Sequence, residues 1–204
     1  LTHPVKIAFL PTVSIGLILL SIAYLPLSKG LSLALWSFGS GLHFVFTLYV
    51  LSSWIHKTTF DIKHLNPAWF IPVVGNLFVP IVAAHFGLTE IAWFFFSIGI
   101  VFWIVMMTIV IYRVVFHDPI PPKLLPTLFI LIAPPAVGFI AYCAMTPGLD
   151  VFSRLLYYTG LFMTLLLGGA ASRFVKNGFF LSSWAYSFPL AAITIATFLM
   201  GKRS

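Results

Sequence analysis

The sequence predicts an all-α polytopic membrane protein, and two observations support that prediction. The chain has 204 residues, of which 61% are hydrophobic and 7% are charged, and its mean hydropathy is +1.09. This composition leaves too little polar surface to solvate a soluble domain of this length. Long uncharged stretches separate the charged residues, and segments such as 98–105 and 161–167 are apolar on every side. A membrane β-barrel would instead alternate polar and apolar residues along each strand.

Seven uncharged runs are long enough to cross a bilayer as helices. A helix rises about 1.5 Å per residue, so roughly 17 to 25 apolar residues cross about 30 Å of hydrocarbon. A helix also satisfies its own backbone hydrogen bonds in lipid. We expect one transmembrane domain over residues 1–204, with spans at residues 7–28, 30–56, 64–89, 91–112, 124–149, 155–172 and 177–201.

The basic residues predict the orientation of the chain. The net charge is +7, but Lys and Arg are dispersed beside the spans and form no patch for nucleic acid. Alternate connections carry more of them on one side, namely Lys6, Lys57, Lys63, Arg113, Lys123, Arg173 and Lys176, than on the other, namely Lys29, Arg154, Lys202 and Arg203. Because cytoplasmic loops are rich in Lys and Arg, we expect the N-terminus on the cytoplasmic side of the inner membrane.

Prolines divide the runs into two alternating kinds. The first, third, fifth and seventh runs contain proline and the others do not, and Pro11, Pro72, Pro134 and Pro189 follow one another at intervals of roughly sixty residues. A two-helix hairpin therefore repeats along the chain. Proline removes a backbone donor, which a membrane tolerates where protein or water satisfies the freed groups. We expect kinked helices around a pore and straight helices outside them.

The chemistry of the expected inner surface favours anions. No inner run carries a charged residue in its middle, so a cation site or a carboxylate proton relay has no support. Basic residues at the mouths, and N–H groups exposed where proline breaks a helix, favour small inorganic or organic anions. The single Cys143 excludes an internal disulfide, and no cluster of Cys and His predicts a metal or cofactor.

Two residues inside the runs are candidates for a role in transport. Phe188 places a bulky ring directly before Pro189, where it would plug the path, although on position alone a core phenylalanine, one of 22 in the chain, is the better explanation. His43 lies at the centre of the second run. An intramembrane histidine is able to couple anion movement to protons, but on a proline-free helix we expect it to hydrogen-bond between helices.

Residues 183–189 (SWAYSFP) resemble the ninth transmembrane helix of the tellurite-resistance/dicarboxylate transporter family, which includes bacterial TehA and the plant guard-cell slow anion channels. Residues 3–6 (HPVK), 66–76 (NPAWFIPVVGN) and 132–135 (IAPP) resemble the openings and kinks of its third, fifth and seventh helices. The resemblance covers essentially the whole chain.

The resemblance implies ten helices in five hairpins, with five kinked helices around a pore, and a homotrimer with one pore per subunit. The seven runs here resemble helices 3 to 9, so we expect a fragment, unless the chain is a seven-span relative that closes its ring differently. By motif, Phe188 matches the phenylalanine that occludes the family's pore. Pro11, Pro72, Pro134 and Pro189 match the kinks that shape it.

The expected function is that of an anion channel or transporter in the bilayer, closed by a phenylalanine gate. The alternative is an alternating-access carrier that exports dicarboxylate such as malate, sulfite or a tellurite oxyanion. We expect no enzymatic activity, because the motifs H-E-x-x-H and G-x-S-x-G are missing. A seven-span retinal protein is disfavoured, since no lysine lies inside the last run to form a Schiff base.

Overall fold

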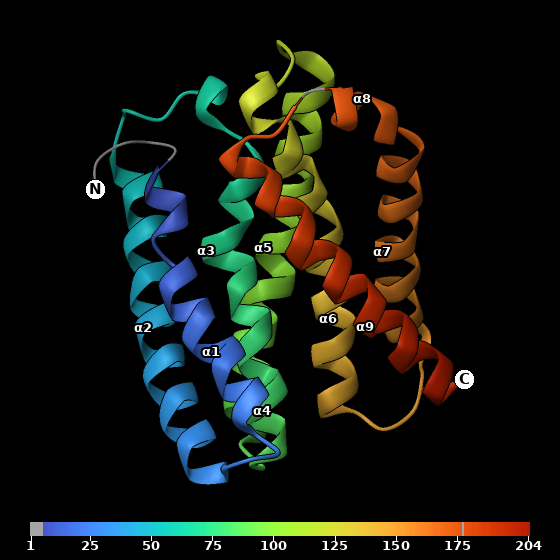
Figure 1. Cartoon of the computed structure of the whole chain (residues 1–204). Coiled ribbons are helices and arrows are strands. Elements are labelled where there is room, and N and C mark those ends of the chain that lie inside the picture. Colours follow the sequence, from blue (N-terminus) through green and yellow to red (C-terminus); the bar gives the residue numbers. More distant parts are fainter. Residues whose placement is uncertain (1–5, 177) are drawn as a thin grey trace.

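The computed structural model describes residues 6–176 and 178–204, so residues 3–5 of the HPVK motif lie outside the described residues. Within these ranges the chain is helical and has no strand. Seven helical segments are long and apolar enough to span a membrane: Lys6–Tyr24, Lys29–His56, Pro67–His85, Thr89–Phe116, Pro122–Met145, Val151–Gly169 and Leu181–Arg203. They run up and down side by side (Figure 1), which confirms the all-α polytopic fold.

The second, fourth and sixth spans, called here the straight spans, are continuous α-helices. They are α2 (Lys29–His56), α5 (Thr89–Phe116) and α7 (Val151–Gly169). None of them contains proline, so no backbone donor is missing from their helical ladders. Two begin at capping side chains: Ser28 accepts from the N–H of Leu31 at the start of α2, and Asp150 accepts from Ser153 at 2.8 Å before α7.

The other four spans, called here the broken spans, each combine 3-10 winding with α winding. The first joins η1 (Lys6–Phe9) to α1 (Thr12–Tyr24), the fifth joins η5 (Pro122–Ile132) to α6 (Ala133–Met145), and the seventh joins η6 (Leu181–Tyr186) to α9 (Ser187–Arg203). The third changes winding three times, through η3 (Pro67–Phe70), α3 (Ile71–Val74), η4 (Gly75–Phe78) and α4 (Val79–His85). The predicted alternation of two kinds of span is therefore present.

The prolines stand where an α segment begins. Pro11 directly precedes α1, Pro72 and Pro134 are the second residues of α3 and α6, and Pro189 is the third residue of α9. In the first turn of an α-helix the N–H groups have no intrahelical acceptor, so proline loses nothing there. The sequence predicted kinks within helices, and the structure places a change of winding at each of these prolines.

Burial separates the broken spans into two pairs. Over an 18-residue stretch of each span, 83% and 72% of the residues of the third and fifth spans are buried. In the other five spans the share of buried residues is 28–33%. The third and fifth spans are thus the interior of the described chain, whereas the first and seventh spans are as exposed as the straight spans. These two form edges of the ring, since α1 packs on α2 and α4, and α9 packs on α6 and α7.

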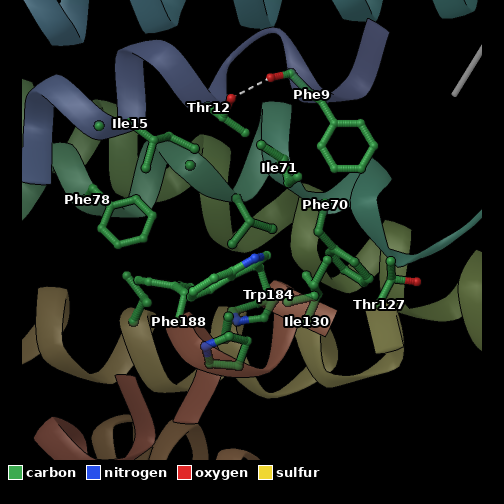
Figure 2. Close-up of a pocket in the computed structure, with 18 of the residues that line it drawn as sticks. Phe9, Thr12, Ile15, Phe70, Ile71, Phe78, Thr127, Ile130, Trp184 and Phe188 are labelled. Atoms are coloured by element: carbon green, nitrogen blue, oxygen red, sulfur yellow. Dashed lines mark hydrogen bonds between the residues drawn. The ribbon is translucent and has the colours of Figure 1, made fainter. Parts of the chain in front are cut away.

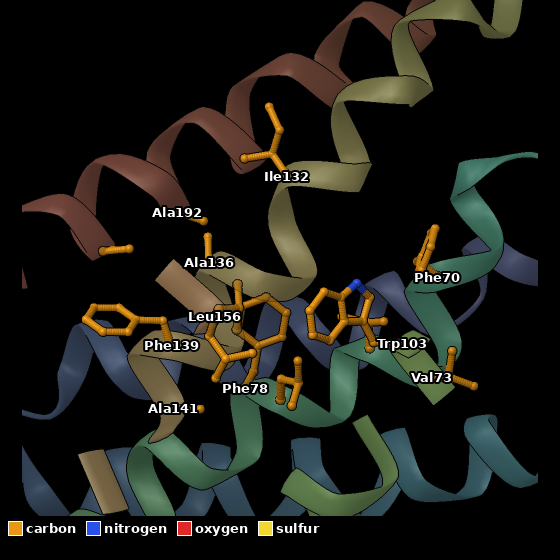
Figure 3. Close-up of a cluster of buried hydrophobic side chains, with 14 of the residues drawn as sticks. Phe70, Val73, Phe78, Trp103, Ile132, Ala136, Phe139, Ala141, Leu156 and Ala192 are labelled. Atoms are coloured by element: carbon orange, nitrogen blue, oxygen red, sulfur yellow. The ribbon is translucent and has the colours of Figure 1, made fainter. Parts of the chain in front are cut away.

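The apolar core lies between the third, fourth, fifth and sixth spans. Figure 3 shows part of this core, including Phe70 and Phe78 of the third span, Trp103 of α5, Phe139 of α6 and Leu156 of α7. Phe139 and Leu156 are completely buried, and Phe70 is 1% exposed. This packing holds the two most buried spans in place beside the straight spans.

The uncharged runs misplace some helix ends. Helix α5 continues four residues beyond the predicted end at 112 and includes Arg113, which is only 4% exposed. The guanidinium of Arg113 donates to the carbonyl of Ile62, in the 3-10 turn η2 (Ile62–His64), at 3.1 Å, and to the carbonyl of Asp118. A charged residue therefore lies inside the last turn of the helix, because loop carbonyls satisfy it. Helix α7 begins four residues before the predicted start at 155, and a short helix, α8 (Ala171–Lys176), follows it.

Candidate functional site

A cavity of about 410 Å³ lies between the broken spans (Figure 2). Each broken span contributes lining residues, for example Thr12 and Ile15 of the first, Phe70 and Gly75 of the third, Thr127 and Pro134 of the fifth, and Trp184 and Phe188 of the seventh. In the part of the chain that the structure describes, no residue of α2, α5 or α7 lines it. The division into two kinds of span is thus also a division between the spans that line the cavity and those that do not.

The wall of the cavity is apolar and uncharged. Three lining side chains, Thr12, Thr127 and Ser182, carry hydroxyl groups. These donate to backbone carbonyls of the chain itself: Thr12 to Phe9 at 2.7 Å, Thr127 to Leu124 at 2.6 Å, and Ser182 to Lys123. Because a hydroxyl has one proton, these groups have none left to donate to a solute. The wall therefore has few groups that would bind an ion tightly.

Phe188 lies in the cavity wall, half-buried, where the sequence placed a gate. Its ring contacts that of Phe78 at the end of η4, with ring centroids 5.3 Å apart at 65°, an edge-to-face contact (Figure 2). The seventh span thus touches the third across the cavity. Sequence reasoning missed Phe78. Its signal was the same as that of Phe188, a phenylalanine close before a proline, here Pro80, in a proline-containing run.

The four predicted shaping prolines fall into two groups. Pro134 and Pro189 line the cavity. Pro72 is buried behind the wall, and its carbonyl accepts a hydrogen bond from Thr47 at 2.7 Å. Pro11 is also buried behind the wall, and its carbonyl accepts from the Ser14 hydroxyl at 2.8 Å.

Helix α2 supplies polar side chains to the backbone of the first and third spans. Thr47 donates to Pro72, Trp36 donates to the carbonyl of Val79 at 3.0 Å, and Ser32 donates to the carbonyl of Ser21 at 2.7 Å. Buried carbonyls need such donors, because lipid offers none. The sequence predicted α2 to be a plain outer helix, and it missed this supporting role.

His43 is on the same face of α2 and is fully buried. Its Nδ1 lies 3.0 Å from Oγ of Ser14 on α1, which confirms the predicted hydrogen bond between helices. The ring also lies against Gly75 of the third span, because a Cβ placed on that glycine would be 2.4 Å from Cε1 of His43. Only a glycine at position 75 leaves room for the ring.

The whole chain, residues 1–204, matches the family model described as voltage-dependent anion channel (SLAC1). The chain is 28% identical to an uncharacterized transporter of Methanocaldococcus jannaschii, over 99% of this chain and 66% of that protein. It is 30% identical to the S-type anion channel SLAH2 of Arabidopsis thaliana, over 96% of this chain and 38% of that channel. It is 26% identical to a tellurite resistance protein TehA homolog of Haemophilus influenzae, over 72% of this chain and 45% of that protein.

The chain therefore spans less than two thirds of the length of each of these relatives. They include both a plant slow anion channel and a TehA homolog, so the resemblance to the tellurite-resistance/dicarboxylate transporter family is confirmed. Its members are multi-pass membrane channels and transporters, in agreement with the seven spans seen here. The chain belongs to the voltage-dependent anion channel (SLAC1) family.

Proposed function

We propose that the four broken spans line the path of an anion channel, and that Phe188 closes this path. The observation that carries the proposal is the cavity itself, which is lined by the broken spans and is crossed by the contact between Phe188 and Phe78. In this proposal the rings of Phe188 and Phe78 form the gate together. Pro11, Pro72, Pro134 and Pro189 shape the path by setting where each α segment begins.

An anion is the favoured solute for two reasons. The described residues of the lining include no carboxylate to attract cations and no charged side chain that would hold an ion too tightly for conduction. Lys and Arg also outnumber Asp and Glu in the chain by 11 to 4, which favours anions at the mouths. The plant relatives are named S-type anion channels, which supports the same choice.

We further propose the setting in which this path works. The N-terminus of the chain lies on the cytoplasmic side of the inner membrane, because the connections on that side hold most of the Lys and Arg. The whole protein assembles as a homotrimer in the lipid bilayer, with one path per subunit, as the family resemblance implies.

The experiment is a comparison of anion currents through the full-length protein in planar bilayers, with and without Phe188→Ala. The matched control is Phe198→Ala, a phenylalanine of the same helix whose side chain is 71% exposed. We expect Phe188→Ala to raise the anion current several-fold at equal protein content, and Phe78→Ala to raise it as well. Phe198→Ala should leave the current unchanged. Equal currents in all four proteins would refute the gate.

The alternative is an alternating-access carrier for dicarboxylate, sulfite or tellurite oxyanions. A cavity of about 410 Å³, large enough for a small organic anion, favours it, as does the name of the TehA homolog. Vesicle uptake separates the two functions. Uptake by a carrier is slow and is accelerated by anion on the opposite side, whereas a channel passes current in single-channel steps.

A further inference from the structure

A buried histidine stands directly behind the cavity wall. The Nδ1 atom of His43 lies 3.0 Å from Oγ of Ser14, and the Ser14 hydroxyl donates to the Pro11 carbonyl at 2.8 Å. With the Ser14 proton on the Pro11 carbonyl, the Ser14 oxygen accepts from Nδ1, which then carries the ring proton. The Nε2 atom then presents a lone pair. Among the described residues it has no hydrogen-bond partner, and it is shielded from solvent.

The unpartnered edge of this ring faces the cavity through a glycine. A Cβ on Gly75 would lie 2.6 Å from Nε2 and 2.4 Å from Cε1 of His43, so nothing but the glycine backbone fits beside them. Gly75 itself lines the cavity, and so does Ile15, whose Cδ1 would lie 2.7 Å from the same Cβ. The imidazole is thus separated from the cavity by the thickness of one backbone segment.

Two other buried polar atoms close to this site in the fold also lack partners. Ser40 Oγ is one turn before His43 on α2, and Asn76 Oδ1 belongs to the residue after Gly75. Unsatisfied polar atoms are rare in protein cores, and a group of them points to a bound ligand, a proton or water. The contact between α2 and the third span therefore holds unpartnered polar atoms that would accept hydrogen bonds from an added proton.

We propose that His43 is the titratable counter-charge of the anion path, an inference that rests on the proposed function. A proton taken from water binds Nε2 when an anion occupies the cavity, and the imidazolium behind Gly75 holds that anion. Either charge alone is unfavourable in this apolar setting, whereas the pair is stabilised. For two unit charges about 8 Å apart at an effective dielectric constant of about 20, Coulomb attraction strengthens anion binding roughly 30-fold.

No other charge is placed to do this. The titratable side chains on α2 and on the elements packed most closely against it, within the described ranges, are Lys29, Tyr49, His56, Tyr24 and His85. Helix α5, which contacts α2 through the Phe44 ring, adds Glu90 in its first turn and Tyr112 and Arg113 near its other end. Lys29 and His56 are the two ends of α2, and the Tyr49 side chain is 40% exposed. Tyr24 and His85 end α1 and α4, about ten residues or roughly 15 Å from the level of His43.

The test uses nitrate, an anion that does not titrate between pH 4 and 8, and the full-length protein opened by Phe188→Ala in planar bilayers. The measured quantity is the nitrate concentration that gives half-maximal current at each pH. We expect this concentration to fall at least tenfold from pH 8 to the acid end. His43→Gln, which keeps a polar side chain but never becomes charged, should abolish the change. His85→Gln should retain it.

A second variant keeps the test decisive if His43→Gln does not fold, which size-exclusion chromatography and thermal melting would reveal. Ser14→Ala retains the imidazole but removes the acceptor of Nδ1–H, so its pH profile should shift while some pH dependence persists. The proposal would be overturned if the half-maximal nitrate concentration of the protein with native His43 did not change with pH. It would also be overturned if His43→Gln or Ser14→Ala left the pH dependence of that concentration unchanged. Absence of nitrate current at every pH would instead refute the anion path itself, and the inference with it.

Discussion

Replacing Gly75 with alanine tests how tightly the third span is packed against its neighbours. The new Cβ would lie 2.4 Å from Cε1 of His43 and 2.7 Å from Cδ1 of Ile15, far inside van der Waals contact. The His43 ring is fully buried and tied to Ser14, so it has little room to retreat. Overpacking of this kind costs about 1–3 kcal/mol of unfolding free energy. The usual gain of about 0.5–1 kcal/mol from Gly to Ala in a helix offsets part of that cost.

The matched control is Gly41→Ala on α2, where a Cβ would meet nothing within 4 Å. It should raise the unfolding free energy by about 0.5–1 kcal/mol through helix propensity alone. Thermal unfolding of the full-length protein in detergent, followed by circular dichroism, measures both changes. For a chain of this size each kcal/mol shifts Tm by about 2–4 °C. We expect Tm to fall for Gly75→Ala and to rise slightly for Gly41→Ala, and an unchanged or higher Tm for Gly75→Ala would refute the reasoning.

Two further predictions concern a buried hydrogen bond and an exposed cap. Thr47→Val removes the donor to the Pro72 carbonyl, so the unfolding free energy should fall by about 1–3 kcal/mol in the same melting assay. Thr108→Val on the exposed face of α5 should change it by less than about 0.5 kcal/mol, and equal losses would contradict the supporting role of α2. The backbone N–H of Ser153 holds the pKa of the Asp150 carboxyl below its usual range, so the stabilisation from this cap is present at neutral pH and is lost as the pH falls through the lowered value. When Tm is measured at decreasing pH, it should therefore fall less for Asp150→Asn than for the wild type. The same fall in both proteins would count against the cap.

The architecture was predictable because proline has a strong local effect. Its missing N–H and its fixed φ restrict where it stands in a helix, so the alternation of proline-containing and proline-free runs predicted the two kinds of span. The charge-free runs predicted the number of spans for a similar reason, since lipid excludes charges. They placed some ends poorly, because Arg113 binds loop carbonyls and continues its helix.

The inner surface was much harder to predict. A 3-10 helix has three residues per turn instead of 3.6, so the eleven residues of η5 rotate the following side chains by more than half a turn relative to an α-helix. Helical periodicity therefore does not show which phenylalanines face the cavity. Phe188 was identified from the family motif, whereas Phe78 needed the structure.

The contact between His43 and Gly75 could not be predicted for a different reason. The sequence shows a histidine in the second run and an isolated glycine in the third, and such a glycine indicates a close approach by some neighbour. Which residue approaches it depends on how the two helices are rotated about their axes. That rotation is set by packing over the whole bundle, so no local pattern encodes it.

The most direct test of whether anions pass between the broken spans is the access of a charged, water-soluble thiol reagent to single cysteines. The full-length protein would carry Phe188→Ala and alanine in place of Cys143 and of any cysteine outside residues 1–204, with a new cysteine either at Thr12, which lines the cavity, or at Thr108, which is exposed on α5. We predict that the reagent blocks the anion current of Thr12→Cys and leaves that of Thr108→Cys unchanged. A current in Thr12→Cys that the reagent does not alter, with modification of the cysteine verified by mass spectrometry, would contradict a path through this cavity.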